Sequence, residues 1–270
     1  KKVVAVSPLM RFKIFAPVTA FVTAAQHLRA SSCLSAVRMS ASTVANESPK
    51  RRMLFLHGML LNPDLYKQKL GKDFFERLEM ENWECHFVQS PRAGTGGGVY
   101  DIVKGLFPNE ESYPEWFNSV DQVDGTKVFD GVEKSLEFLQ NYLNEQPKFD
   151  AIGGHSQGAT MASLLTYLVE NEPGWIPSDK KWGGVLCMNA PNSFEKERSF
   201  VERIQKSGAS IDTPSVHVFG GSTDETWEGQ QKLQTVHYPD HSKIIQHENG
   251  HWFPSNEEYV GAIMSALNEL

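Results

Sequence analysis

The sequence has few cysteines, and they form no recognisable pattern. Only three occur in 270 residues, Cys33, Cys85 and Cys187, and none belongs to a CxxC pair. A disulfide framework needs several paired cysteines, and a structural zinc site needs clustered ligands. We therefore expect unpaired, mostly buried thiols in a reducing compartment and no metal site.

Basic side chains and long apolar runs are also scarce. The 26 Lys and Arg residues face 33 Asp and Glu residues, a net charge of −7. This balance argues against a nucleic-acid binder, whose affinity for phosphates comes from clustered basic residues. The apolar run over residues 14–25 is too short for a transmembrane helix and is interrupted by Pro17. The apolar fraction of 40% still suffices for a continuous core, which excludes a disordered or collagen-like chain.

The charge is divided unevenly along the chain. Residues 1–50 carry seven basic side chains and one acidic side chain, a net charge of +6, so the remaining 220 residues carry −13. The first 50 residues are also rich in Ser, Thr and Ala and lack a strong helix or strand period. That composition is typical of a targeting segment. We expect a leader over 1–50 and a single folded domain over 51–270.

Two interpretations of this leader remain open. Residues 10–13 and 14–25 resemble the charged and apolar regions of a signal peptide, and residues 26–50 resemble a transit peptide. Together they resemble the bipartite presequences of proteins imported into complex algal plastids. The alternative is a disordered or wrongly assigned extension of an enzyme whose translation begins at Met10 or Met39. The expected location is the cytoplasm, or a plastid or mitochondrion if the leader is a genuine presequence.

From residue 51 onward, short apolar runs alternate with longer amphipathic segments. We expect strands over 53–56, 84–89, 149–153, 184–188, 215–219 and 242–247. We expect a helix from about residue 63, helices over 125–144, 157–169, 194–204, 225–233 and 257–270, and a long loop over 90–124. This alternation predicts an α/β fold with a mostly parallel central sheet flanked by helices. Its functional sites are expected beyond the carboxyl ends of the strands.

The strongest motif is Gly154-x-Ser156-x-Gly158, between an apolar strand and an Ala-rich helix. A nucleophile on a tight strand-to-helix turn needs small neighbours at both glycine positions, so that the chain can reverse and expose the hydroxyl. The same turn places the backbone N–H of Gln157 at a helix start, where the dipole favours negative charge. The alternative is a glycine turn with a bystander serine.

A serine nucleophile needs a base, and His251 is the best-placed histidine. It lies in a loop after the last strand and before the C-terminal helix, at the sheet edge that carries the serine turn. Its rival His247 falls within the strand pattern, and His155 is expected to have a structural role. His237 and His241 look like surface loop residues. A metal site formed by His237, Asp240 and His241 is the weaker interpretation of that cluster.

The base in turn needs a carboxylate, for which Asp224 is the candidate. It follows a buried strand, and the chain order Ser156, Asp224, His251 is that of the α/β-hydrolases. Glu225 and Asp212 are rivals, and a helix N-cap is the alternative role for Asp224. The loop that starts at His57-Gly58 should bring the backbone N–H of Met59 beside that of Gln157 as an oxyanion hole, with His57 orienting the loop.

With these residues assembled, residues 51–270 resemble the FSH-type serine hydrolases of the α/β-hydrolase superfamily. The resemblance rests on several motifs: Phe55-Leu56-His57-Gly58, the segment 149–159, His217-Val218-Phe219-Gly220, Gly250-His251, and the aromatic segment Tyr113-Pro114-Glu115-Trp116-Phe117. It implies hydrolysis of carboxylic esters or thioesters of acyl chains, without a cofactor. The implied partner is a small acyl ester or thioester.

The segment over 90–124 is more apolar than a solvated connection needs, so we expect a short lid-like insertion that binds an acyl chain. The expected pocket residues are Leu60, Tyr113, Trp116, Phe117 and Trp252. Two alternatives stay open, because a fold does not fix a function. One is a thioesterase or acyltransferase of a biosynthetic pathway, and the other is a non-catalytic ligand-binding module.

Overall fold

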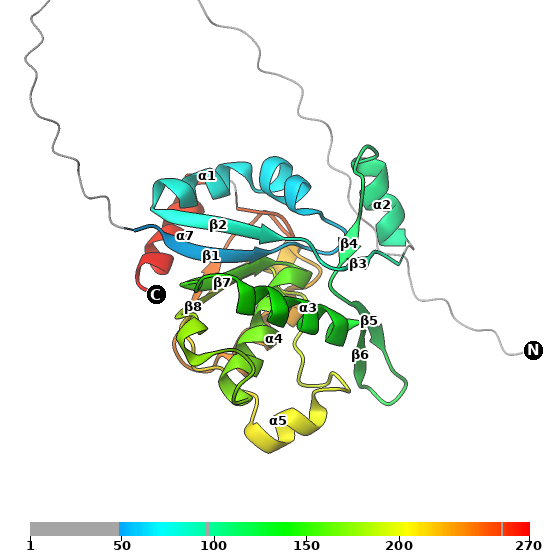
Figure 1. The fold of residues 1–270 in the computed structure, drawn as a ribbon. Coiled ribbons are helices and arrows are strands. Elements are labelled where there is room, and N and C mark those ends of the chain that lie inside the picture. Colours follow the sequence, from blue (N-terminus) through cyan, green and yellow to red (C-terminus); the bar gives the residue numbers. More distant parts are fainter. Residues whose placement is uncertain (1–48, 96–97, 255) are drawn as a thin grey trace, which may run out of the picture. The chain divides into compact units, whose positions relative to one another are not determined.

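Six parallel strands form the central sheet of the computed structural model, which describes residues 49–95, 98–254 and 256–270 (Figure 1). Across the sheet the order is β10-β9-β8-β7-β1-β2, and every pairing between these strands is parallel. The strands are β1 (Arg51–Leu56), β2 (Trp83–Val88), β7 (Ala151–His155), β8 (Gly184–Met188), β9 (Ser215–Phe219) and β10 (Ser242–Gln246). All six expected strands are confirmed. The central strands β7, β8 and β9 are buried at every residue, as expected when helices cover both faces.

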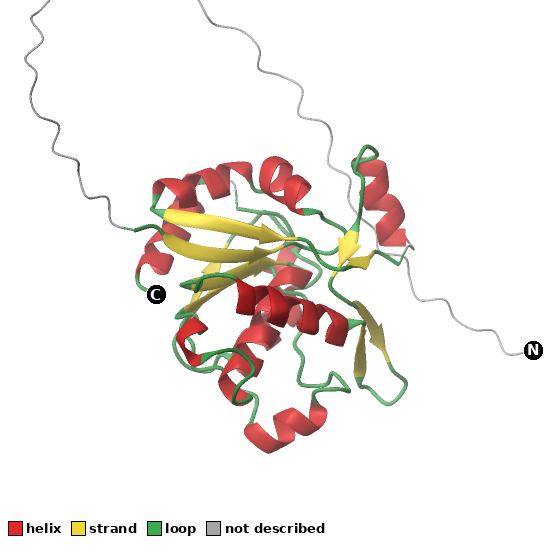
Figure 2. Ribbon diagram, viewed as in Figure 1, coloured by secondary structure: helices red, strands yellow, loops and turns green. Residues whose placement is uncertain are grey.

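Helices cover both faces of this sheet (Figure 2). Successive residues of β1 show the division: Met53 and Phe55 belong to one apolar cluster, whereas Leu54 and Leu56 belong to the other. The first cluster contains α1 (Lys72–Met80) and α7 (Glu257–Asn268). The second contains α3 (Val132–Glu145), α4 (Gln157–Asn171) and α6 (Trp227–His237). Besides the helix of the insertion described next, the remaining helical segments are η1 (Leu65–Leu70), α5 (Val201–Ser207), η2 (Ser178–Lys180) and η3 (Gly221–Thr223).

The expected loop over 90–124 is wrong in part, because this insertion contains secondary structure. It holds β3 (Arg92–Ala93), α2 (Gly98–Leu106), β4 (Pro114–Glu115) and β5 (Asn118–Asp121). Strands β3 and β4 pair antiparallel, and the guanidinium of Arg92 lies 3.4 Å from the buried carboxylate of Glu115. Figure 1 shows α2 beyond the carboxyl ends of β1 and β2, beside β3 and β4. The insertion therefore lies at the edge of the sheet where the functional site is expected.

Two of the expected helices begin later than predicted. The first turn of the helix expected over 125–144 is instead β6 (Lys127–Asp130), which pairs antiparallel with β5, and Gly131 with φ 82° separates it from α3. Of the helix expected over 194–204, only the part from Val201 is helical. The reason is the buried carboxylate of Glu197, which accepts hydrogen bonds from the amides of Phe129 (3.1 Å) and Ser199 (2.8 Å) and so holds an irregular segment.

The expected leader over 1–50 lies outside the described residues, apart from Pro49 and Lys50. No helix in the described part of the chain is both long and apolar enough to cross a membrane. Cys85 and Cys187 are free thiols, and Cys187 is buried, whereas Cys33 lies outside the described residues.

Candidate active site

Ser156 occupies the turn between β7 and α4 with a backbone conformation that few non-glycine residues adopt. Its φ of 55° and ψ of −127° are strained, and such strain is concentrated at functional sites. The close approach of the flanking chain explains both glycines of the motif. A Cβ on Gly154 would lie 2.3 Å from the backbone of Gly158, and one on Gly158 would lie 2.1 Å from the carbonyl oxygen of Leu56.

His251 lies in the loop between β10 and α7, and its ring reaches Ser156. Its Nε2 is 2.8 Å from Ser156 Oγ, while its Nδ1 lies 3.0 Å from Oδ2 and 3.1 Å from Oδ1 of Asp224. Nδ1 faces a carboxylate and therefore carries the proton, which leaves Nε2 to accept the hydrogen bond from the Ser156 hydroxyl. The structure thus brings Ser156, His251 and Asp224 together in one hydrogen-bonded chain.

The carboxylate of Asp224 is buried and held by several donors. The backbone N–H and the hydroxyl of Thr226 both donate to Oδ1 at 2.8 Å. Burial alone would raise the pKa of Asp224, but the hydrogen bond from His251, the positive charge of this ring when it is protonated, and the two donors of Thr226 outweigh it. The pKa of Asp224 is therefore well below its ordinary value, and the group is ionised. The N-cap position of α6 is occupied by Thr226, not by Asp224.

Two further donors to Asp224 were not predicted from the sequence. The side-chain amides of Asn189, which directly follows β8, and Gln230, on α6, both donate to Oδ2 of Asp224. Asn189 also donates to the carbonyl oxygen of Gly250 at 2.8 Å. The one available signal was the position of Asn189 at the end of a buried strand, next to the sheet edge that carries the site.

The expected oxyanion loop forms a tight turn after β1. The Leu61 amide donates to the carbonyl oxygen of Gly58 at 3.2 Å, and Leu60 has a positive φ of 63°. His57 orients this loop, because its Nε2 accepts from the Ser90 amide at 3.0 Å and its Nδ1–H donates to the Gly58 carbonyl at 2.8 Å. Burial lowers the pKa of His57 to about 4, which keeps the ring neutral. Gln157 is the first residue of α4, so its amide has no partner within the helix.

The other histidines near these loops are structural. His155 is buried and stacks on Phe253, and its Nε2 lies 3.2 Å from the carbonyl oxygen of His251. Burial and the neighbouring His251 lower the pKa of His155 to about 3. His247 is fully buried and accepts from the Asn249 amide through Nδ1. None of these rings contacts the Ser156 hydroxyl in the described part of the structure.

One expectation about the 237–241 segment is wrong. His237 is not a surface loop residue but a fully buried part of α6, where it stacks on Phe194 at 3.9 Å and donates from Nδ1 to the Ala209 carbonyl. His241 is exposed, as expected. Over the described residues, no group of three His, Cys, Asp or Glu side chains is arranged to hold a metal ion.

Four of the five expected pocket residues are buried, so the prediction that they line a substrate pocket is wrong. Trp116 and Phe117 are fully buried, the first stacked on His57 and the second on Phe129, so neither presents surface to a substrate. The physical reason is that both rings complete the core between α3, α4 and the insertion. Leu60 and Tyr113 are also buried, at 2% and 8% exposed, and of the five only Trp252, next to His251, is exposed, at 55%.

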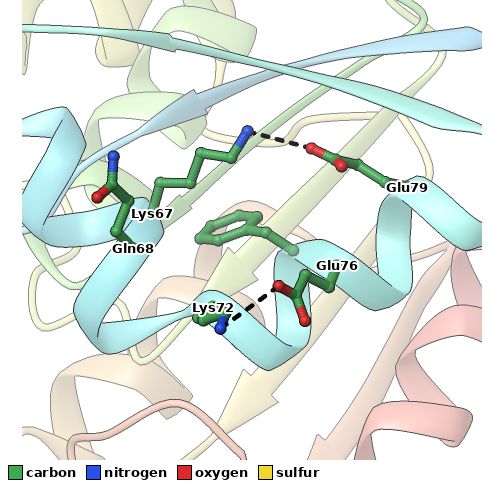
Figure 3. Close-up of a pocket in the computed structure, with 6 residues that line it drawn as sticks. Lys67, Gln68, Lys72, Glu76 and Glu79 are labelled. Carbon is green, nitrogen blue, oxygen red and sulfur yellow. Dashed lines mark hydrogen bonds and ion pairs between the residues drawn. The ribbon is translucent and has the colours of Figure 1, made fainter.

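One surface cavity lies away from these residues. It has a volume of about 330 Å³, and charged side chains of η1 and α1 line most of it (Figure 3). Lys67 pairs with Glu79 at 3.1 Å and Lys72 pairs with Glu76 at 3.7 Å, so its charges are largely neutralised within the wall. None of the candidate site residues lines this cavity.

A family model described as serine hydrolase (FSH1) matches residues 46–263. The chain belongs to the FSH1 serine hydrolase family. The esterase OVCA2 of Bos taurus is 28% identical over 230 residues, which cover 82% of this chain and 97% of that protein. The esterase OVCA2 of Xenopus tropicalis is 25% identical over 228 residues, which cover 80% and 93%.

A solved structure shares the fold. The crystal structure of esterase PE8 has a TM-score of 0.50 at 16% identity and covers 82% of this chain and 93% of its own. The expected α/β-hydrolase fold is thus confirmed, and the protein is a serine hydrolase.

Proposed function

We propose that the protein hydrolyses carboxylic esters or thioesters of acyl chains through a Ser156, His251 and Asp224 triad and an acyl-enzyme intermediate. The observation that carries this proposal is the continuous hydrogen-bonded chain from Ser156 Oγ to His251 Nε2 (2.8 Å) and from His251 Nδ1 to Asp224 Oδ2 (3.0 Å). The strained backbone of Ser156 supports it, because the turn presents the hydroxyl at the end of β7.

In the first half of the reaction, Ser156 Oγ bonds to the carbonyl carbon of the substrate while its proton moves to His251 Nε2. Asp224 stabilises the resulting imidazolium through Nδ1–H. The backbone amides of Met59 and Gln157 donate to the negatively charged oxygen of the tetrahedral intermediate. The intermediate collapses as the bond to the leaving group breaks, and His251 returns its proton to the departing alcohol or thiol.

The second half repeats these steps with water. His251 accepts a proton from a water molecule, whose oxygen bonds to the acyl carbon, and the bond to Ser156 Oγ then breaks as the proton is returned to it. The carboxylic acid leaves and the free enzyme is restored. In each half His251 acts once as a base and once as an acid, so the enzyme gains and loses no proton and water is the only other reactant.

The acyl chain is proposed to bind beside α2. This helix is anchored next to the oxyanion loop through Tyr113. Its hydroxyl donates to the Phe107 carbonyl and its ring packs on Tyr100 with centroids 5.4 Å apart. The next residue, Pro114, accepts at its carbonyl oxygen from the Leu60 amide of the loop. The exposed Ile102 and Leu106 of α2 offer apolar surface that the fold itself does not use. Together with exposed Trp252, they take the pocket role first expected for Trp116 and Phe117.

The proposal is tested by labelling with a fluorophosphonate probe, which reacts with an activated serine. We expect wild-type protein to be labelled and to hydrolyse nitrophenyl esters, and Ser156→Ala to lose both properties. His251→Gln should lose most of the esterase activity. His247→Gln is its matched control and should keep it, because His247 is buried four residues away without contact to Ser156. Labelling of Ser156→Ala, or none of the wild type, would overturn the assignment.

A further inference from the structure

Residues 114–117 of the insertion, which we call the strap, are hydrogen-bonded to both segments that carry the proposed oxyanion amides. One of these segments is the turn after β1 that contains Met59, and the other is the start of α4 at Gln157. The strap comes from a part of the chain that follows β2 and is remote from both in sequence.

On the Met59 side, the strap makes two hydrogen bonds that flank this residue. The Leu60 amide donates to the carbonyl oxygen of Pro114 at 2.7 Å. The indole N–H of Trp116 donates to the carbonyl oxygen of His57 at 2.9 Å, and the two rings stack with centroids 4.9 Å apart. Met59 is thus held between two fixed points, one before it and one after it.

On the Gln157 side, the side-chain carboxamide of this residue makes two hydrogen bonds to the strap. Its Oε1 accepts from the backbone N–H of Trp116 at 2.7 Å, and its Nε2 donates to the carbonyl oxygen of Phe117. The reversed amide orientation would set a donor against a donor, so this orientation is the one consistent with the bonding. The Gln157 side chain is buried, and the hydroxyl of Ser135 also donates to the Trp116 carbonyl.

We propose that the strap, acting through the Trp116 indole and the Gln157 carboxamide, is a positioning element that fixes the Met59 and Gln157 amides relative to each other. The inference rests on the proposed function, since it concerns the oxyanion hole of that reaction. Oxyanion donors accelerate a reaction because they are already oriented when charge develops. Loosening the strap should therefore impair the transition state more than substrate binding.

The first test is Trp116→Phe, which keeps an aromatic ring on His57 but removes the donor to its carbonyl. We expect kcat for a nitrophenyl ester to fall by about tenfold with KM within about twofold, a smaller loss than deletion of an oxyanion donor causes. Affinity for a phenylboronic acid, which forms a tetrahedral adduct on serine, should fall by the same factor as kcat. A purely structural role would lower the melting temperature and leave kcat and the boronate affinity at the wild-type level.

Trp182→Phe is the matched control. Trp182 is also a buried tryptophan, and its indole donates to the hydroxyl of Thr166 at 3.0 Å, outside the site. It should lose thermal stability while kcat and boronate affinity stay at the wild-type level. Equal kinetic losses in the two tryptophan variants would overturn the proposal.

Gln157→Met supplies the second test and serves alone if Trp116→Phe does not fold. It retains the backbone amide of residue 157 and a side chain of similar length but removes both hydrogen bonds to the strap. Wild-type kcat in a folded variant of either kind would overturn the proposal. Failure of the proposed function is distinct, because it would appear in the wild type as missing probe labelling, or as labelling that survives Ser156→Ala.

Discussion

The side-chain amide of Asn189 links Asp224 to the loop that carries His251. It donates to Asp224 Oδ2 at 3.1 Å and to the carbonyl oxygen of Gly250 at 2.8 Å. Asn189 has a φ of 51°, a left-handed conformation that Asn and Gly adopt readily. Asn189, at the end of β8, therefore holds the loop after β9 and the loop after β10 close to each other.

This relationship predicts the effect of Asn189→Gly, which keeps the backbone conformation and removes both hydrogen bonds. We expect kcat/KM to fall by about tenfold, because a hydrogen bond to a charged group contributes about 1.5–3 kcal/mol. Steady-state hydrolysis of a nitrophenyl ester measures this loss, and circular dichroism checks folding. Wild-type activity would show that Thr226 and Gln230 alone position the carboxylate.

Asp224→Asn should abolish most of the activity without unfolding the protein. The amide cannot stabilise the imidazolium and favours the wrong tautomer of His251, so we expect kcat to fall by about 10⁴-fold. Glu225→Gln is the control, because it neutralises the adjacent exposed carboxylate and should leave kcat unchanged. The opposite pattern would move the acid role to Glu225.

The acyl-binding role of α2 predicts a chain-length effect. Leu106→Glu places a charge on a side chain that is 59% exposed. We expect KM for nitrophenyl dodecanoate to rise by about tenfold or more, since each buried methylene contributes about 0.8 kcal/mol, while KM for the acetate ester stays unchanged. Met80→Glu, at a 76% exposed position of α1, controls for surface charge. Equal effects on both esters would contradict an acyl site beside α2.

Stability should fall on acidification through buried histidines such as His217. Burial lowers the pKa of His217 to about 3 from an ordinary value of 6.5. Below about pH 6.5 the unfolded chain binds a proton at this residue that the folded chain excludes, so its contribution to stability is lost as pH falls from 6.5 toward 3. Between pH 7 and pH 5 the loss is about 2 kcal/mol for this group.

His217→Gln removes that contribution, and urea unfolding at the two pH values measures it. The loss of unfolding free energy on going from pH 7 to pH 5 should be smaller in the variant than in the wild type by about 2 kcal/mol. His241→Asn, at an exposed histidine with positive φ, should retain the wild-type dependence. An unchanged pH dependence in His217→Gln would mean that His217 is protonated in the folded protein as readily as in the unfolded chain.

The sheet could be predicted from the sequence because its central strands are short apolar runs with both faces covered. The insertion could not, since β3 and β4 contain only two residues each and are held by the Arg92 and Glu115 pair rather than by a local pattern. The same applies to the segment at Glu197, where a buried carboxylate replaces a helix turn. Local periodicity carries no information about such long-range partners.

The residues of the candidate site likewise differ in whether a local sequence pattern identifies them. Ser156, Asp224 and His251 were each identified from a motif or a position after a strand, and the structure places them in contact. Asn189 and Gln230 act through side-chain hydrogen bonds to Asp224, which no spacing in the sequence reveals. The sequence predicts Trp116 as a pocket residue, because an aromatic residue in an insertion gives the same pattern whether it is exposed or buried.

The strap also limits how this enzyme can be altered by recombination. Insertions that follow the second strand are natural segments to exchange when a new specificity is wanted. Here, however, the stretch that contacts α2 is covalently continuous with Pro114 and Trp116, which hold the turn after β1. A graft should therefore join the chains before Pro114, so that the host retains its own strap and only the apolar helix is replaced.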